Sequence, residues 1–338
     1  MDFMNSLDRN TPILTIGIPT FNRSEAVCTR LQELITLEMS NQIQILVIDN
    51  HSTDGTAENL NKSMIPSHMI SKVQIISNES NLGFVGNFFS LFDHCRTEYL
   101  LVCSDEDQII ESGLQRLLEF LGERSPDFVS PQAEVRGQIY RGRKKIHKLD
   151  YLQHEEASFY ISGLCFKIES AQKFLERFPD LVKNNSLVEV YPQTALAGFL
   201  LAEGNGFWLD TVVTRQLNEL PSHIVHSDGG AYFHLCGRFE QLKGSISLAD
   251  LIISNELLRQ ESRDSIIRYK ELLNEQLFQR MRTALFYEYP EMMRHFDKGA
   301  RRYYLFSWLT RFYGSRFSTL VGRLTPSLIR RILRRLLR

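Results

Sequence analysis

The sequence lacks a long apolar run, a paired pattern of cysteines and, near its end, any acidic residue. No stretch approaches the ~18 apolar residues that span a bilayer, and no basic segment precedes an apolar run at the start. We therefore expect neither a transmembrane protein nor one with a standard secretory signal. The five cysteines are odd in number and scattered, which indicates reduced thiols in a cytoplasmic protein.

The remaining composition is that of an ordinary globular protein. Of the 338 residues, 43% are hydrophobic and 23% are charged, enough for one substantial domain with a smaller addition. After Ile246 the chain is mostly helical in pattern. We expect a main domain over residues 1–245 and a helical C-terminal region over residues 246–338.

Strand-like and helix-like segments alternate between residues 13 and 130. Apolar runs predict strands at residues 13–18, 43–48, 73–76 and 99–103. Helices are expected from Ser24 to about Leu37 and again from Thr56. This alternation predicts right-handed crossovers and an α/β fold whose sheet is mostly parallel. Further along, we expect a strand over residues 158–167 and a helix over residues 192–203.

Polar clusters follow all four of the first predicted strands. They occupy residues 19–23, 49–54, 78–87 and 104–107. Ligands of such sheets bind beyond the carboxyl ends of the strands. We therefore expect these clusters to converge on one site.

The last of these clusters contains three consecutive carboxylates, Asp105, Glu106 and Asp107. Like charges this close raise one another's pKa, so a divalent cation that holds an anionic substrate is a natural partner. Oxygen ligands suit Mn²⁺ or Mg²⁺, which bind through one or two carboxylates plus substrate phosphates. A solvated acidic turn is the alternative.

The four clusters resemble the motifs of inverting family 2 glycosyltransferases, which have the GT-A fold and use nucleotide sugars. The matching segments are Pro19-Thr-Phe-Asn-Arg23, Val47-Ile-Asp-Asn-His-Ser-Thr-Asp-Gly-Thr56, Asn81-Leu-Gly-Phe-Val-Gly-Asn87 and Ser104-Asp-Glu-Asp107. The resemblance covers roughly residues 12–210. It implies a Rossmann-like, mostly parallel sheet flanked by helices. Ser162-Gly163 and Tyr191-Pro-Gln193 are similar to bacterial enzymes that build O-antigen or capsular polysaccharide.

The resemblance implies that the first loops bind the nucleotide of the donor. Pro19 and Phe21 lie in the first loop, where the aromatic ring would stack on the base; a core phenylalanine is the alternative. Asp49 would accept a hydrogen bond from a pyrimidine, which favours UDP, CDP or dTDP. A turn or capping role is the alternative for Asp49, and it is the preferred interpretation of Asp54.

The third loop would border the ribose or the phosphates. Asn81 can bond to either group, and Gly83 permits close approach of the backbone, although an Asx turn explains the pair nearly as well. Asn87 is a weaker candidate for the same contact.

By resemblance, Asp107 is the direct metal ligand, and Asp105 lies nearer the ribose or a metal-bound water. The metal would act as a Lewis acid that stabilises the departing nucleoside diphosphate. Some GT-A enzymes supply a late histidine to the metal or pyrophosphate, and His226 is the candidate here, ahead of His223. A structural or solvent-exposed histidine is the alternative.

An inverting transfer also needs a general base for the acceptor hydroxyl. The family's acidic residue corresponds to a position at or near Gln193, and glutamine cannot take a proton. We nominate Glu189, the nearest carboxylate upstream, while a solvated loop glutamate is the alternative. Asp228 is weaker. Without a base, the chain would be a nucleotide-sugar-binding module.

The last 41 residues, from Lys298, contain 11 Lys/Arg and no Asp/Glu. A helix that starts at Thr325-Pro326 would segregate leucines and isoleucines from Arg330, Arg331, Arg334 and Arg335. This pattern is typical of a helix that lies on an anionic membrane surface, although packing against protein is the alternative. Nucleic acid is disfavoured because no recognised nucleic-acid module accompanies the arginines.

These features predict a cytoplasmic enzyme, peripheral at the inner face of the membrane, that transfers a sugar to a glycan or lipid-linked glycan. A sugar nucleotidyltransferase is the rival enzyme, disfavoured because no glycine-rich phosphate loop with Lys or Arg follows the first strand.

Overall fold

The structure is a computed structural model. It describes residues 12–38, 42–60, 64–140, 145–217, 235–254 and 262–273. The chain divides into two compact units, one of residues 1–225 and 240–271, the other of residues 226–239 and 272–338. Every strand described below belongs to the first unit.

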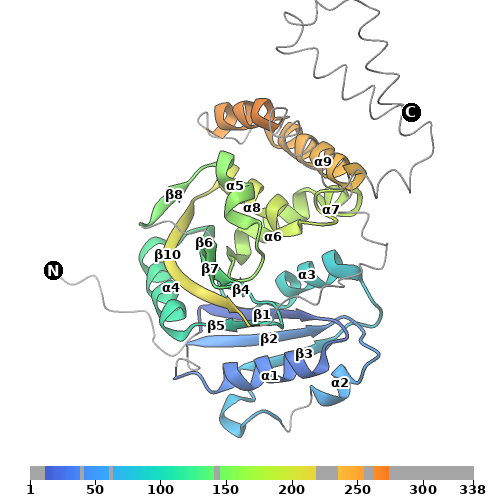
Figure 1. The fold of residues 1–338 in the computed structure, drawn as a ribbon, viewed down its shortest axis with the longest axis vertical. Helices are drawn as coiled ribbons and strands as arrows, with labels where there is room; N and C mark the ends of the chain where they lie inside the picture. Colours follow the sequence, from blue (N-terminus) through green and yellow to red (C-terminus); the bar gives the residue numbers. More distant parts are fainter. Residues whose placement is uncertain are drawn as a thin grey trace, which may run out of the picture. The chain divides into compact units, whose positions relative to one another are not determined.

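A single mixed sheet forms the centre of this unit (Figure 1). Its strands are β1 Leu14–Thr20, β2 Ile43–Asp49, β3 Val73–Ser77, β4 Tyr99–Val102, β5 Asp107–Ile109, β6 Phe128–Val135, β7 Gln138–Tyr140, β8 His147–Leu149, β9 Cys165–Lys167 and β10 Gly206–Gln216. They follow the order β3-β2-β1-β4-β9-β6-β10-β5, with β7 beside β6 and β8 beside β10. The expected parallel arrangement holds for β1 to β4, whereas β9 runs antiparallel to both β4 and β6.

The described helices are α1 Ser24–Ile35, α2 Thr56–Asn59, α3 Gly83–His94, α4 Glu111–Arg124, α5 His154–Ser158, α6 Ile168–Arg177, α7 Pro179–Asn184, α8 Pro192–Glu203 and α9 Leu235–Ser254. Helix α1 covers one face of the parallel half of the sheet and α3 covers the other (Figure 1). Short 3₁₀ turns occur at Ser67–Met69 and Tyr151–Gln153. This architecture agrees with the predicted α/β fold of the GT-A type.

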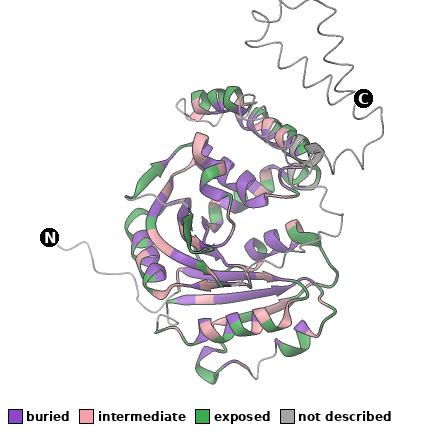
Figure 2. Cartoon of the chain, viewed as in Figure 1, coloured by how far each residue is buried: buried purple, intermediate pink, exposed green. Residues whose placement is uncertain are grey.

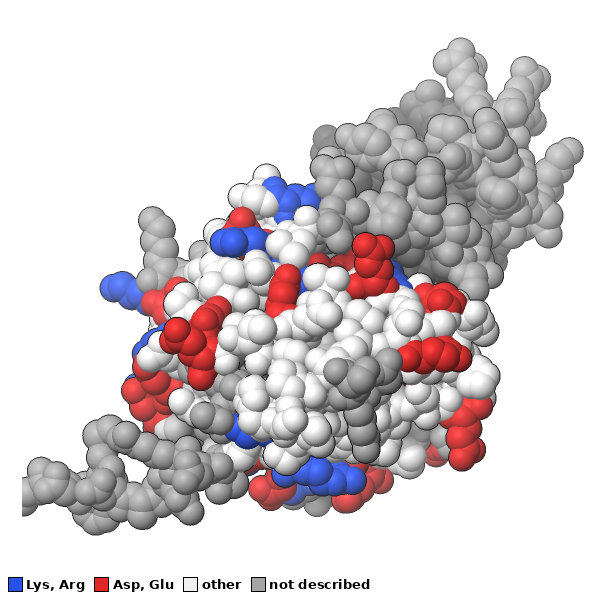
Figure 3. All heavy atoms as spheres, turned by 90° about the horizontal axis from the view of Figure 1, so that it is seen from below, with Lys and Arg blue, Asp and Glu red and all other residues white. Residues whose placement is uncertain are grey.

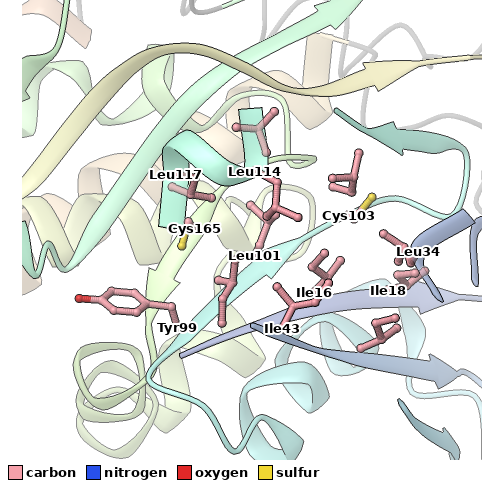
Figure 4. Close-up of a cluster of buried hydrophobic side chains, with 14 of the residues drawn as sticks. Ile16, Ile18, Leu34, Ile43, Tyr99, Leu101, Cys103, Leu114, Leu117 and Cys165 are labelled. Atoms are coloured by element: carbon pink, nitrogen blue, oxygen red, sulfur yellow. The ribbon is translucent and has the colours of Figure 1, made fainter. Parts of the chain in front are cut away.

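One half of the core lies between α1, α4 and the strands β1, β2 and β4. Ile16, Leu34, Leu101 and Leu114 belong to the same fully or almost fully buried cluster (Figure 4). The apolar side chains of α4 recur at helical spacing, so one side of the helix is buried and the other meets water. Figure 2 shows the consequence, because the central strands are buried along most of their length while the helices expose one side.

Aromatic rings fill the other half of the core. Phe92 of α3 lies 5.6 Å from Phe166 of β9, and Phe166 lies 5.3 Å from Phe128 of β6, measured between ring centroids. Phe174 of α6 contacts Phe199 of α8 at 5.3 Å. Such ring pairs add to the free energy of burial. They join the second half of the sheet to the parallel half that carries the predicted loops.

The four predicted strands and the helix at residues 192–203 are confirmed, with ends that differ by one or two residues at most. The strand predicted over residues 158–167 is wrong for most of its length, because Ser158 ends α5 and β9 covers just Cys165–Lys167. Between them Gly163 takes a φ of +85°, and Gly163 donates a backbone hydrogen bond to Val102. Phe159 is 56% exposed, and Tyr160 and Ile161 are half-buried, so the apolar run here belongs to an irregular loop and reflects neither strand pairing nor full burial.

Two expectations about the C-terminal region stay untested. The predicted domain boundary at residue 245 falls inside α9 and stays a prediction. The basic helix from Thr325 lies outside the described residues. Within the described ranges, no helix is both long and apolar enough to cross a membrane.

Candidate active site

Four loops meet at the carboxyl ends of the parallel strands. Thr20 is paired with Asp49 and Asp49 with Ser77, so the three strands end side by side. The backbone N–H of Asn22 donates to Ser52 Oγ at 2.7 Å, which joins the first two loops. Asn22 has a φ of +53°, a left-handed conformation that asparagine tolerates. The predicted convergence of the loops is therefore present.

Asp105 is buried and both of its carboxylate oxygens are engaged. Thr20 Oγ1 donates to Oδ2 at 2.7 Å, and Arg23 Nη1 donates to Oδ1 at 3.0 Å. The same guanidinium nitrogen lies 2.8 Å from Glu106 Oε1. Burial raises the pKa of Glu106, and Arg23 opposes that rise. Arg23 thus forms ion pairs with both Asp105 and Glu106.

Asp107 is also buried, with 1% of its surface exposed. It opens β5, and its Oδ2 accepts a hydrogen bond of 2.6 Å from the hydroxyl of Tyr160. Burial raises the pKa of Asp107 and the charge of Asp105 adds to the rise, while the hydroxyls of Tyr160 and Ser162 and the charge of Arg30 lower it. The environment of Asp107 therefore disfavours its charged form unless a positive charge lies nearby.

Asp105 and Asp107 suit a hard divalent cation, because buried carboxylates with an excess of negative charge are stabilised by one. The described residues contain no cluster of three or more His, Cys, Asp or Glu that could hold a metal. A site completed by substrate phosphates needs fewer protein ligands. The predicted ligand His226 lies outside the described residues, as do His223 and Asp228.

A network of asparagines holds the second and third loops together. Asn50 Nδ2 donates to Asn81 Oδ1 at 2.8 Å, and Asn50 Oδ1 accepts from Asn78 at 3.0 Å and from the backbone of Leu82 at 2.9 Å. Asn78 also donates to Asn87 at 3.1 Å. The side chains of Asn50 and Asn87 each donate and accept, so the network fixes the shapes of both loops together.

The candidates of the third loop have structural partners. Asn81 Oδ1 accepts from the N–H of Gly83 at 2.8 Å, which is the Asx turn considered as the alternative. Gly83 has a φ of +71°, and a Cβ there would meet open space, so the conformation rather than crowding favours glycine. Asn87 is buried and donates weakly to the carbonyls of Thr20 and Ile48. Asn87 therefore positions strand ends.

The candidates of the first two loops lie at the same edge of the sheet. Phe21 is 40% exposed, which contradicts the alternative of a core phenylalanine, and Pro19 is half-buried in β1. Asp49 is buried and accepts hydrogen bonds from the backbone and hydroxyl of Ser52, as the turn interpretation requires. Asp54 accepts from the N–H groups of Ser24 and Thr56, so it caps two helices.

The position of the general base remains a prediction. Glu189 is exposed in the turn that precedes α8. Gln193 lies in the first turn of α8, where it is 3% exposed and its Oε1 has no hydrogen-bond partner. A buried amide oxygen cannot take the proton of an acceptor hydroxyl, so Gln193 is not a candidate for the general base.

Sequence reasoning missed several residues at the site, among them Thr20, Arg23, Asn50 and Tyr160. Thr20 and Asn50 are adjacent to predicted candidates at the strand ends, and this position was the available signal. Tyr160 gave no such signal, because it reaches Asp107 from 53 residues further along the chain.

The fold and the arrangement of loops are those of an α/β protein of the GT-A type. Residues 15–179, just under half of the chain, match the model of Glycosyl transferase family 2. The match and the fold together support a glycosyltransferase of family 2. No curated protein sequence matches the chain.

Solved structures support the fold assignment. S. aureus TarS 1-349 is 15% identical with a TM-score of 0.56, over 81% of this chain and 74% of that one. TarS 1-349 in complex with UDP-GlcNAc is 14% identical with a TM-score of 0.55, over 81% of this chain and 73% of that one. The mannosyltransferase PcManGT from Pyrobaculum calidifontis was solved in complex with GDP-Man and Mn²⁺. It is 13% identical with a TM-score of 0.54, over 92% of this chain and 83% of that one.

We predict that Asn50→Ala lowers the free energy of unfolding by about 1–3 kcal/mol, since it removes four part-buried hydrogen bonds that join the two loops. The matched control is Asn59→Ala, which removes one exposed hydrogen bond to Ser24 and should cost less than about 1 kcal/mol. Urea denaturation measures both. Equal effects of the two changes would contradict the network.

Proposed function

We propose that this glycosyltransferase is inverting and metal-dependent, and that it transfers a hexosyl or deoxyhexosyl group from a nucleotide-sugar donor. The observation that carries the proposal is the burial of Asp105 and Asp107 at the meeting point of the four loops. Carboxylates placed there oppose the binding of a diphosphate unless a cation lies between them. The complexes of TarS with UDP-GlcNAc and of PcManGT with GDP-Man and Mn²⁺ support a donor of this class.

Donor recognition is assigned to the first three loops. Phe21 presents an exposed ring on which a base can stack. Asp49 keeps acceptor capacity beyond its contacts with Ser52, since a carboxylate has about four lone-pair sites. A pyrimidine base, as in UDP, CDP or dTDP, can donate to it. Asn81 and Gly83 border the ribose or the phosphates through the backbone of their turn.

Asp107 is the residue assigned to hold Mn²⁺ or Mg²⁺, and Asp105 lies on the ribose side of the site. When bound, the cation would offset the charge of the diphosphate and stabilise the nucleoside diphosphate as it leaves. The hydroxyl of Tyr160 orients Asp107, and that of Thr20 orients Asp105. Both carboxylates are therefore held in place before the donor arrives.

Glu189 is our candidate for the base that takes the proton of the acceptor hydroxyl. Its exposure leaves it accessible to an acceptor that arrives from solvent. Attack by that hydroxyl opposite the leaving group inverts the anomeric carbon. The rival function is a nucleotide-sugar-binding module without turnover, which the buried Gln193 favours. Binding of a nucleotide sugar without hydrolysis or transfer would identify the module.

We extend the proposal to cell-surface polysaccharide, such as O-antigen or capsule, with a glycan or lipid-linked glycan as acceptor. The basic pattern of the last residues supports it, because a lipid-linked acceptor is concentrated at the surface that such a helix binds. The proposal includes a location in the cytoplasm, peripheral at the inner face of the cell membrane.

We predict that Asp107→Asn removes the Mn²⁺-dependent part of the thermal shift produced by UDP, CDP, dTDP or GDP. Turnover should fall at least ~100-fold, because even outer partners of a metal site are worth about 10–100-fold. The amide oxygen can still accept from Tyr160, so the fold should survive. Asp210→Asn, an exposed carboxylate of β10, is the control. Near-normal activity with unchanged metal dependence would sink the assignment.

We predict that Glu189→Gln lowers kcat by at least ~100-fold and leaves donor binding unchanged, in line with the usual contribution of a general base. Glu189 is exposed, so we do not expect its substitution to lower kcat by unfolding the protein. Donor titration and initial rates of transfer separate the two effects. If kcat does not change, another group takes the proton.

We predict that removal of residues 325–338 releases the protein from anionic liposomes and spares turnover on a soluble acceptor analogue. Glutamine at Arg330, Arg331, Arg334 and Arg335 should weaken binding less completely, since each basic residue contributes about 1 kcal/mol at an anionic surface. Flotation at two salt concentrations measures both. Failure of the full chain to float, or unfolding of the truncated chain, would show that the segment packs against protein.

A further inference from the structure

Arg23 supplies positive charge beside Asp105 and Glu106, where a divalent cation would otherwise supply it. Its Nη1 lies 3.0 Å from Asp105 Oδ1 and 2.8 Å from Glu106 Oε1. Within the described ranges, it is the one basic residue that forms an ion pair with these carboxylates. Thr20 holds the other oxygen of Asp105 at 2.7 Å. A cation that approaches Asp105 therefore competes with Arg23 for the same negative charge.

The carboxylates are fixed and the arginine is the part that can move. The side chain of Asp105 is 4% exposed, whereas that of Arg23 is 36% exposed. The backbone carbonyl of Arg23 accepts from the N–H of Val27 at 3.1 Å, so the main chain is tied to the first turn of α1. The long side chain beyond it lies partly in solvent, where an incoming ligand can reach it.

A guanidinium also has strong affinity for phosphate. It donates two parallel hydrogen bonds to a phosphate group as readily as to a carboxylate. The loop that carries Arg23 follows β1, beside the loops that we assign to the donor. A donor bound there brings two phosphates to the same edge of the sheet as Arg23.

We propose that Arg23 is a positioning residue that couples donor binding to cation binding, an inference that rests on the proposed function. In the free protein, Arg23 neutralises Asp105 and Glu106 and lowers the affinity of the site for a divalent cation. When a nucleoside diphosphate group binds, the guanidinium transfers its hydrogen bonds to the phosphates, and the carboxylates become available. Donor and cation then bind with positive cooperativity, which is reciprocal by linkage.

Mn²⁺ alone is the probe for the first half of this proposal. Electron paramagnetic resonance of free Mn²⁺ gives its Kd for the full-length wild type, Arg23→Gln and Arg23→Lys without nucleotide. We expect Arg23→Gln to bind Mn²⁺ at least about tenfold more tightly than wild type, because it removes one positive charge a few ångströms from the ion. Arg23→Lys keeps the charge and should remain within about threefold of wild type.

Arg116→Gln is the matched control. Arg116 has the same side-chain exposure, 36%, and it pairs with Glu119 and Glu123 on the outer side of α4. Its loss removes an equal charge from the protein without touching the site, so the Kd for Mn²⁺ should stay at the wild-type value. This control separates the local effect of Arg23 from a change in net charge.

The second half of the proposal, the coupling of nucleotide binding to cation binding, is measured on the wild type. It therefore does not depend on the folding of a variant. Titration of Mn²⁺ with and without saturating UDP, CDP, dTDP or GDP should show at least about tenfold tighter binding with the matching nucleotide. In Arg23→Gln this gain should shrink, because the unbound site is already open to the ion.

Equal Kd values for Mn²⁺ in wild type and Arg23→Gln, including no binding by either, would overturn the proposal. So would the absence of coupling between nucleotide and Mn²⁺ in the wild type. Failure of the proposed function has a different signature, namely that none of the four nucleotides binds at any Mn²⁺ concentration and no donor is turned over.

Discussion

The structure depends on how the buried carboxyl groups of Asp105 and Asp107 are stabilised away from water. A buried carboxylate is stable when hydrogen bonds and opposite charge replace its hydration. Thr20 and Arg23 do this for Asp105, while Tyr160 and Ser162 do it for Asp107. These partners come from the loop after β1 and from the loop between α5 and β9. The two carboxylates thereby draw separate parts of the chain to one edge of the sheet.

The same edge is stabilised on its other side by neutral groups. The amides of Asn50, Asn78, Asn81 and Asn87 bond to one another and to strand ends, so the second and third loops need no ligand to keep their shape. The edge thus has buried carboxyl groups on one side and neutral amides on the other. On the face shown in Figure 3, by contrast, acidic and basic side chains are interspersed around a broad area without charge.

The parallel half of the fold could be predicted because its signals are local. Each strand from β1 to β4 is a short apolar run, and each is followed by polar residues where the chain leaves the core. The strand predicted over residues 158–167 is wrong for most of its length, because Phe159, Tyr160 and Ile161 belong to an irregular loop in which Phe159 is 56% exposed. An apolar run by itself reports neither burial nor the hydrogen-bond partner of a residue.

By itself, the sequence determined where the first four strands lie along the chain, the polar clusters at their ends and the family that these clusters resemble. All of these are properties of neighbouring residues. The tertiary structure decided which side chains share the site. Tyr160 reaches Asp107 across 53 positions of the chain, and Arg23 reaches Asp105 across 82. Contacts of that range follow from sheet register and loop closure, since these bring distant residues within hydrogen-bonding distance, and no local pattern records them.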